Sequence, residues 1–169
     1  TVTSLCNSGP GSLRAAIACA NSNPGQDTVT FQVAGTINII SQLPTLSDTS
    51  GGTLIDGTTA PGYAGSPVIV LDGPGVSSFV RGLHVTSADN EVRALQIQDF
   101  SWGVWLDGAG ATGNRITRSY LGTDGTNAID AQIGVRIDDA ANNFIGTDGD
   151  GLDDALEGNV ISGNSARGI

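Results

Sequence analysis

The residues with the clearest potential for chemistry lie between positions 147 and 157, where the sequence reads TDGDGLDDALE. Asp148, Asp150 and Asp153 bring carboxylates close together, and hard oxygen ligands of this kind are those that Ca²⁺ prefers. An EF-hand loop would have an oxygen-bearing side chain where this run has Leu152. We predict that a metal at this loop would be Ca²⁺ bound by these three aspartates. The alternative is a solvated acidic loop.

A second group of candidates concerns catalysis on polysaccharides. Asp138 and Asp139 form the only adjacent carboxylate pair on an expected strand, and paired carboxylates hydrolyse glycosidic bonds. Neighbouring residues of a strand point to opposite faces, however, and His84 lies in a different repeat. Arg136 is the best candidate for the base of a lyase. With no Lys to bind an acidic substrate, we predict no catalytic residues, and a pectate-lyase-like enzyme is the alternative.

Aromatic side chains offer a third kind of site. Trp102 and Trp105 flank the start of one expected strand, and together with Tyr120 they form a candidate glycan-binding face. The alternative is that the three rings fill the core and the corners of the fold. Coplanar, exposed rings would favour glycan binding, and buried rings would favour a scaffold.

These residues are organised by an internal repeat. Residues 103–116, GVWLDGAGATGNRI, return in altered form at residues 134–145 as GVRIDDAANNFI, and further copies of the frame start at Gly82 and Gly168. Each copy has short alternating apolar segments that are too short for helices, separated by turn residues, which indicates strands. Repeats that recur in register stack on one another, because no single copy can bury its apolar face alone.

The repeat predicts an all-β fold, a right-handed parallel β-helix (a solenoid) with a short N-terminal capping helix. Asn114 and Asn143 occupy the same turn position, where Asn tolerates the left-handed conformation and its amide can bond to the Asn of the next layer. An antiparallel sandwich with similar strand spacing is the alternative.

The first 25 residues differ from the repeats. Ser12 is the expected N-cap of a helix whose apolar residues lie on one face and which ends before Gly25. We expect residues 1–25 to cap the strands, and residues 26–169 to form the coils, open at the C-terminal end. A disulfide between Cys6 and Cys19 is predicted to hold this cap and would indicate an extracytoplasmic setting. Two buried free thiols are the alternative.

Composition narrows the range of partners. The net charge is −10 and all seven basic residues are Arg, which argues against nucleic acid as a partner because phosphate binding depends on clustered Lys and Arg. No apolar run is long enough to span a membrane. The acidic, Gly-rich composition is typical of secreted repeat proteins.

One family resemblance adds to these observations. The run SLRAAI at residues 12–17 resembles the core of the CSLREA motif, and the segments TLIDGTTAPGYAGSPVIVLDG, YLGTDGTNAI and FIGTDGDGLDDALEGNVISGN are similar to the body of the same bacterial surface or secreted β-helix proteins. Gly11 stands where the motif has Cys, and Ala15 replaces its Glu. The resemblance implies a fold and an extracellular or cell-surface location, but no catalytic residues.

Taken together, these patterns predict an extracellular structural or adhesive module, acting as a rigid spacer or as a self-associating fibre subunit. Its expected partner is a second copy in head-to-tail contact, or the rest of a longer array, with surface glycans as a further candidate. A carbohydrate-binding module is the alternative function.

Overall fold

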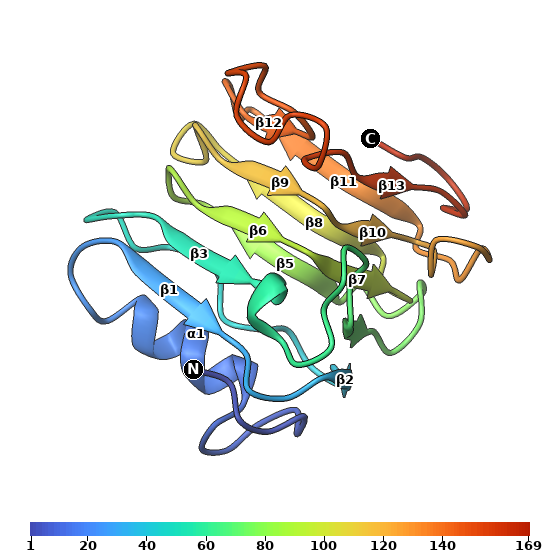
Figure 1. Cartoon of the computed structure of the whole chain (residues 1–169), viewed down its shortest axis with the longest axis horizontal. Coiled ribbons are helices and arrows are strands. Elements are labelled where there is room, and N and C mark those ends of the chain that lie inside the picture. The colour runs from blue at the N-terminus through green and yellow to red at the C-terminus, as the bar shows by residue number, and fades with distance from the viewer.

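The computed structural model describes residues 1–169 and arranges them as short strands stacked in successive layers (Figure 1). Thirteen strands form three sheets, and all ten pairs of neighbouring strands run parallel. The antiparallel sandwich is therefore excluded.

Each sheet takes one strand from each layer that contributes to it. The first sheet contains β1 (Asp27–Thr30), β3 (Thr53–Asp56), β6 (Glu91–Arg93), β9 (Arg115–Thr117) and β12 (Phe144–Ile145). The second contains β2 (Gly35–Asn38), β4 (Ile69–Asp72), β7 (Leu95–Gln98), β10 (Tyr120–Leu121) and β13 (Val160–Ile161). The third has only β5 (Arg81–Val85), β8 (Trp102–Asp107) and β11 (Ile133–Asp138). A short 3₁₀ helix, η1 (Gly57–Thr59), follows β3.

The predicted fold class, an all-β right-handed parallel β-helix, is wrong. The structure combines three separate parallel sheets with one α-helix, and it is not a closed solenoid. No strand of the third sheet precedes β5, and a single bridge between Leu46 and Val85 takes its place. The physical reason lies in the sequence before residue 82, where the repeated Gly frame is missing and Pro44 removes a backbone donor from the segment that would form this strand.

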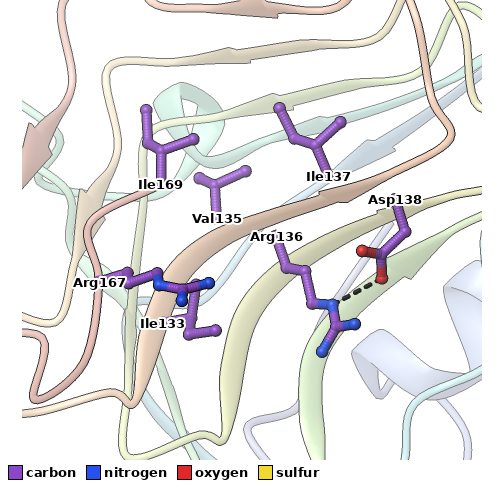
Figure 2. Close-up of a pocket in the computed structure, with 7 residues that line it drawn as sticks. All are labelled: Ile133, Val135, Arg136, Ile137, Asp138, Arg167 and Ile169. Carbon is purple, nitrogen blue, oxygen red and sulfur yellow. Dashed lines mark hydrogen bonds and ion pairs between the residues drawn. The ribbon is translucent and has the colours of Figure 1, made fainter.

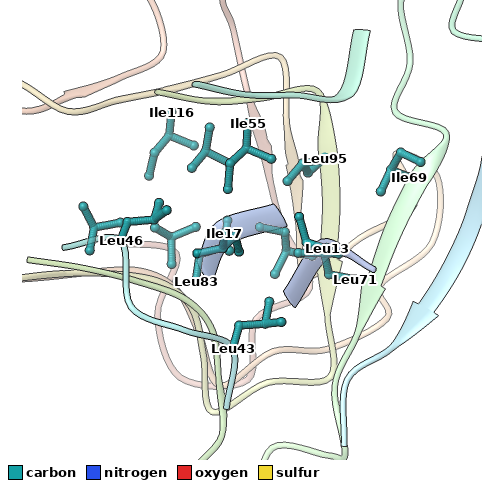
Figure 3. Packing of buried hydrophobic residues seen from close by; sticks show 14 of the residues in the cluster. Leu13, Ile17, Leu43, Leu46, Ile55, Ile69, Leu71, Leu83, Leu95 and Ile116 are labelled. Atoms are coloured by element: carbon teal, nitrogen blue, oxygen red, sulfur yellow. The ribbon is translucent and has the colours of Figure 1, made fainter. Parts of the chain in front are cut away.

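The helix α1 (Leu13–Ala20) covers the N-terminal end of the stack (Figure 1). The hydroxyl of Ser12 accepts from the amide of Ala15, as expected of an N-cap. Leu13 and Ile17 are fully buried and join the same apolar cluster as residues of the sheets, including Leu83 (Figure 3). The predicted helix and its N-cap are confirmed. No helix has the length and apolar character needed to cross a membrane.

The repeated glycines lie directly above one another. A Cβ atom on Gly82 would lie 2.3 Å from the carbonyl oxygen of Gly103, and one on Gly103 would lie 2.6 Å from that of Gly134. The same relation links Gly134 to Gly168, at 2.7 Å. The backbones therefore approach so closely that no side chain fits, which explains why each of the four copies of the frame starts with Gly.

A ladder of asparagines runs beside the first sheet. The Oδ1 atom of Asn114 accepts from both the backbone amide (2.8 Å) and the side-chain amide (3.0 Å) of Asn90, and Asn143 Oδ1 accepts from the amide of Asn114 at 2.8 Å. The predicted bonds between layers are confirmed. The left-handed conformation, however, belongs to the residue before each Asn, namely Asp89, Gly113 and Asn142.

Candidate functional site

The outer face of the third sheet brings together both tryptophans, the histidine and two arginines. We call Arg81, His84, Trp102, Trp105 and Arg136 the aromatic–arginine face. Cross-strand register brings them together: Arg81 is paired with Trp102, and His84, Trp105 and Arg136 occupy equivalent positions in β5, β8 and β11. Each of these five side chains is partly exposed.

His84 is held in one orientation. Its ring lies parallel to that of Trp105, with centroids 4.2 Å apart and an interplanar angle of 10°. Its Nδ1 atom lies 3.1 Å from the hydroxyl of Thr45, and its Nε2 atom lies 3.1 Å from Oδ2 of Asp107. Both ring nitrogens are thus engaged, and the imidazole covers one face of the indole.

The two tryptophans are surrounded by guanidinium groups. The Cζ atom of Arg81 lies 4.8 Å from the ring centroid of Trp102 and 4.5 Å from that of Trp105. The Cζ atom of Arg136 lies 4.3 Å from Trp102 and 5.9 Å from Trp105. The two indoles meet edge to face, 5.0 Å apart at 62°. These distances are those of cation–π contacts, so each indole has cationic neighbours in the layers before and after it.

Asp138 completes the face. Its Oδ2 atom accepts from Nε of Arg136 at 2.6 Å and from Nε1 of Trp105 at 2.8 Å. The hydrogen bond from Arg136 holds the pKa of Asp138 below its ordinary value, and the bond from Trp105 adds to this effect. The carboxyl group is therefore ionised at neutral pH. Asp139 follows in a left-handed conformation and is exposed, without a bond to this group.

The predicted glycan-binding face is not assembled as expected. Tyr120 lies in β10 of the second sheet, where its hydroxyl donates to Ser66 Oγ at 3.2 Å, away from the third sheet. Trp102 and Trp105 do meet, but they are not coplanar, and they are neither fully exposed nor buried. Sequence reasoning missed Arg81 and did not group His84 with the tryptophans. The signal was present, because His84, Trp105 and Arg136 each stand two residues after the frame's Gly, and Arg81 and Trp102 each stand directly before it.

The acidic loop forms a cluster, with different members from those predicted. Asp148, Asp154 and Glu157 each offer a carboxylate oxygen, and these oxygens lie within 4.8 Å of one another, so the three residues could hold a metal ion. Asp150 instead accepts from the amide of Leu152 at 2.7 Å. The expected ligand set is thus corrected at two of its three positions.

Arginines already bind several of these carboxylates. Arg115 Nη2 contacts Asp148 Oδ2 and lies 3.4 Å from Glu157 Oε1. Asp153, the third predicted ligand, forms an ion pair with Arg118 at 3.1 Å. A cation at the cluster would therefore compete with Arg115 for the same oxygens.

A cavity of about 270 Å³ opens beside β11 (Figure 2). Seven residues line it: Ile133, Val135, Arg136, Ile137, Asp138, Arg167 and Ile169. Figure 2 shows Val135 and Ile137 on the same side of β11 as Ile169, and the pair of Arg136 and Asp138 on the other. The cavity combines an apolar side that continues the core with a polar side that continues the aromatic–arginine face.

The predicted disulfide is absent from the structure, where Cys6 and Cys19 are both free and exposed. The geometry of the cap explains this. Nε of Arg14, in the first turn of α1, donates to the carbonyl of Asn7 at 3.0 Å, which holds Cys6 near the start of the helix. Cys19 lies five residues beyond Arg14, about 7.5 Å further along the axis and on a different face.

No known protein family, no curated protein and no solved structure matches the chain.

Proposed function

We propose that this protein is a structural or adhesive module, extracellular or at a cell surface, that associates through the open edge of its parallel sheets. The edge strands of the three sheets are β11, β12 and β13, and they lie at one end of the stack (Figure 1). Each presents an exposed apolar side chain there: Ile137, Phe144 and Val160 are 40%, 42% and 38% exposed. The presence of an exposed apolar side chain on all three edge strands at one end of the stack is the observation that carries the proposal.

The open edge is incomplete in a specific way. On its free side, the first half of β11 pairs with the segment around Arg167, through bonds from the amides of Gly134 and Val135. The second half, around Ile137, has no strand partner on that side, and the cavity lies there. An unpaired, partly apolar strand edge readily accepts another strand. The cavity has the position of the next strand, which a second copy or the rest of a longer array would supply.

The opposite end of the stack is covered, because α1 and the bridge between Val2 and Phe31 lie over β1. A head-to-tail contact would have to displace this cap. The contact that we propose is therefore between the open edges of two copies, which is an isologous interface and closes as a dimer.

Association can be tested on residues 1–169 by light scattering and sedimentation over a range of concentrations. We expect a dimer that Ile137→Lys abolishes, because a charge at the edge opposes strand addition. Ile40→Lys is the matched control: Ile40 is 71% exposed and lies outside the edge strands, so association should persist. A strictly monomeric wild-type protein at high concentration would contradict self-association and would leave the edge to a strand of another origin.

We further propose that the cluster of Asp148, Asp154 and Glu157 takes Ca²⁺. Three carboxylates at this separation repel one another, and Arg115 neutralises only part of their charge. Glu157 is 8% exposed, so its carboxylate is held inside the loop. We expect Ca²⁺ to raise the melting temperature, and Glu157→Gln to remove this effect while Asp150→Asn leaves it. An unchanged melting temperature with Ca²⁺ and with chelator would eliminate the site.

The aromatic–arginine face gives little support to the stacking of a neutral sugar. Stacking needs an uncovered ring face, but His84 lies over Trp105, and Arg81 and Arg136 lie over Trp102. We assign no catalytic residue to it.

A further inference from the structure

We propose that the aromatic–arginine face binds the carboxylates of an acidic polysaccharide, with Arg81 as the principal ligand-binding residue. The starting observation is that the guanidinium of Arg81 makes no hydrogen bond and no ion pair with any other residue, and its Nε atom is buried without a partner. In a chain with a net charge of −10, an unpaired arginine held among partly buried groups is unusual. A buried donor without an acceptor is costly unless a ligand satisfies it.

Arg81 is fixed in place by contacts that do not use its donors. Its backbone is held by Gln42, whose Oε1 accepts from the Arg81 amide at 3.0 Å and whose Nε2 donates to the Arg81 carbonyl at 3.3 Å. Its guanidinium packs on Trp102 and Trp105 through cation–π contacts. No residue accepts a hydrogen bond from the guanidinium, and because Nε is buried, a ligand would bind the two terminal Nη groups. These groups can bind a planar carboxylate by two parallel hydrogen bonds.

Further guanidinium groups follow Arg81 along the stack. Arg136 lies two strands away in β11, and Arg167 lies in the segment that pairs with β11. Arg136 has donors beyond the Nε that binds Asp138, and the Arg167 side chain is exposed and unpaired. Neighbouring parallel strands are about 4.8 Å apart, so the three groups span roughly 14 Å. A row of cations on this scale suits a linear polymer with repeated anions better than a single small anion.

The chemistry of the face favours carboxylates on sugars over phosphates on nucleic acid. Asp107 and Asp138 lie in the same face and can accept hydrogen bonds from a ligand, and phosphate groups offer no donors to them. A uronic acid chain carries one carboxylate per sugar, with hydroxyl groups between them that can bond to these aspartates. Arg136 and Arg167 also line the cavity at the open edge, but Arg81 lies in β5, two strands away, so variants of Arg81 test this inference separately from self-association.

The two tryptophans of the chain are Trp102 and Trp105, so its tryptophan fluorescence reports on this face alone. The probes are a uronic acid tetrasaccharide, its carboxyl-reduced neutral counterpart, sodium sulfate and single-stranded DNA. We expect a saturable fluorescence change with the uronic acid tetrasaccharide only, weakened by added salt. Equal binding of the neutral sugar, or sulfate binding as tightly as the tetrasaccharide, would overturn the assignment.

Variants locate the site. Arg81→Gln should weaken tetrasaccharide binding by about tenfold or more, which is the size expected for the loss of a charge-assisted pair. Arg81→Lys keeps the charge and most of the packing but loses the planar fork, so it should also weaken binding. It serves as the second variant if Arg81→Gln does not fold. Arg118→Gln removes the same charge at the acidic loop and should bind as the wild type does. Unchanged binding in a folded Arg81→Lys or Arg81→Gln protein would refute the proposal, as would tighter binding of single-stranded DNA.

Discussion

Asp56 shows how one side chain ties two layers together. Its carboxylate accepts from Nε and Nη2 of Arg93, at 3.1 and 2.7 Å, and from the amide of Thr58 at 3.0 Å. Burial alone would raise the pKa of Asp56, but the bonds from Arg93 and Thr58 outweigh it and hold the pKa below its ordinary value. Asp56 thus stabilises the fold in its ionised form.

Removing Arg93 should show how much the fold depends on the ionised form of Asp56. Arg93→Ala leaves a carboxylate that is 6% exposed without its cation, so we expect the free energy of unfolding at pH 7 to fall by about 2–3 kcal/mol. The stability that the lowered pKa of Asp56 contributes is fully present above the pKa of Asp in the unfolded chain, about 3.9. It disappears as the pH falls through the pKa of Asp56 in the folded protein. The difference between variant and wild type should therefore shrink in acid.

Urea unfolding at several pH values measures this difference. Arg118→Ala is the control, because its partner Asp153 is largely exposed, and we expect a cost of at most about 1 kcal/mol. A cost for Arg93→Ala that does not change with pH would show that the arginine acts through packing alone.

At the scale of the elements, the asparagine ladder is the main polar connection between layers. Asn114 is 2% exposed, and its Oδ1 accepts two bonds from Asn90, while its own Nδ2 has no partner. Asn114 therefore stabilises the fold through its acceptor oxygen, Oδ1, and not through its side-chain amide group. Asn114→Ala should lower the free energy of unfolding by about 2–3 kcal/mol, since it leaves buried donors unsatisfied.

Chemical denaturation with circular dichroism gives the measurement. Asn127→Ala, in an exposed loop, should change stability by no more than about 0.5 kcal/mol. An equally small effect at Asn114 would mean that water replaces the ladder at this position.

Much of the local structure could be predicted from the sequence. The frame copies that start at Gly103 and Gly134 lie on β8 and β11, and α1 begins after its expected N-cap, Ser12, and ends before Gly25. The frame starts at 82, 103, 134 and 168 are in register, because their glycines are in backbone contact. These features depend on local patterns: the apolar period, the cap residue and the spacing of Gly.

What could not be predicted depends on contacts between layers. The repeat places His84, Trp105 and Arg136 at equivalent positions, but the contacts of Arg81 and Arg136 with both indoles depend on how the layers stack. The predicted β-helix assumes that the regular repeats extend to the N-terminal layers, but these layers lack the frame and form no strand of the third sheet. The predicted metal ligands rest on the spacing of aspartates along the sequence. In the structure the loop turns so that Asp154 and Glu157, not Asp150 and Asp153, lie beside Asp148.

At the scale of the whole molecule, the two ends of the stack differ. One end is covered by α1, whose Leu13 and Ile17 are fully buried, and the other ends in the two-residue strands β12 and β13 with exposed apolar side chains. In a stack where each layer contacts only its neighbours, stability is the sum of layer and interface contributions, and opening starts where interfaces are fewest. Amides of β12 and β13 should therefore exchange with solvent faster than those of β4 and β7.

A substitution in the capping helix α1 tests whether the layers open from the ends of the stack. Ile17→Ala removes a fully buried side chain and should cost about 2–4 kcal/mol. If the layers open from their ends, hydrogen exchange followed by mass spectrometry should show faster exchange in β1 and β3, next to α1, and little change in β12 and β13. A uniform acceleration across all three sheets would instead mean that the molecule opens as one cooperative unit. In that case the open edge at β11 would be as rigid as the capped end. A strand that binds there would then pair with an edge that is already ordered, and binding would not have to order it.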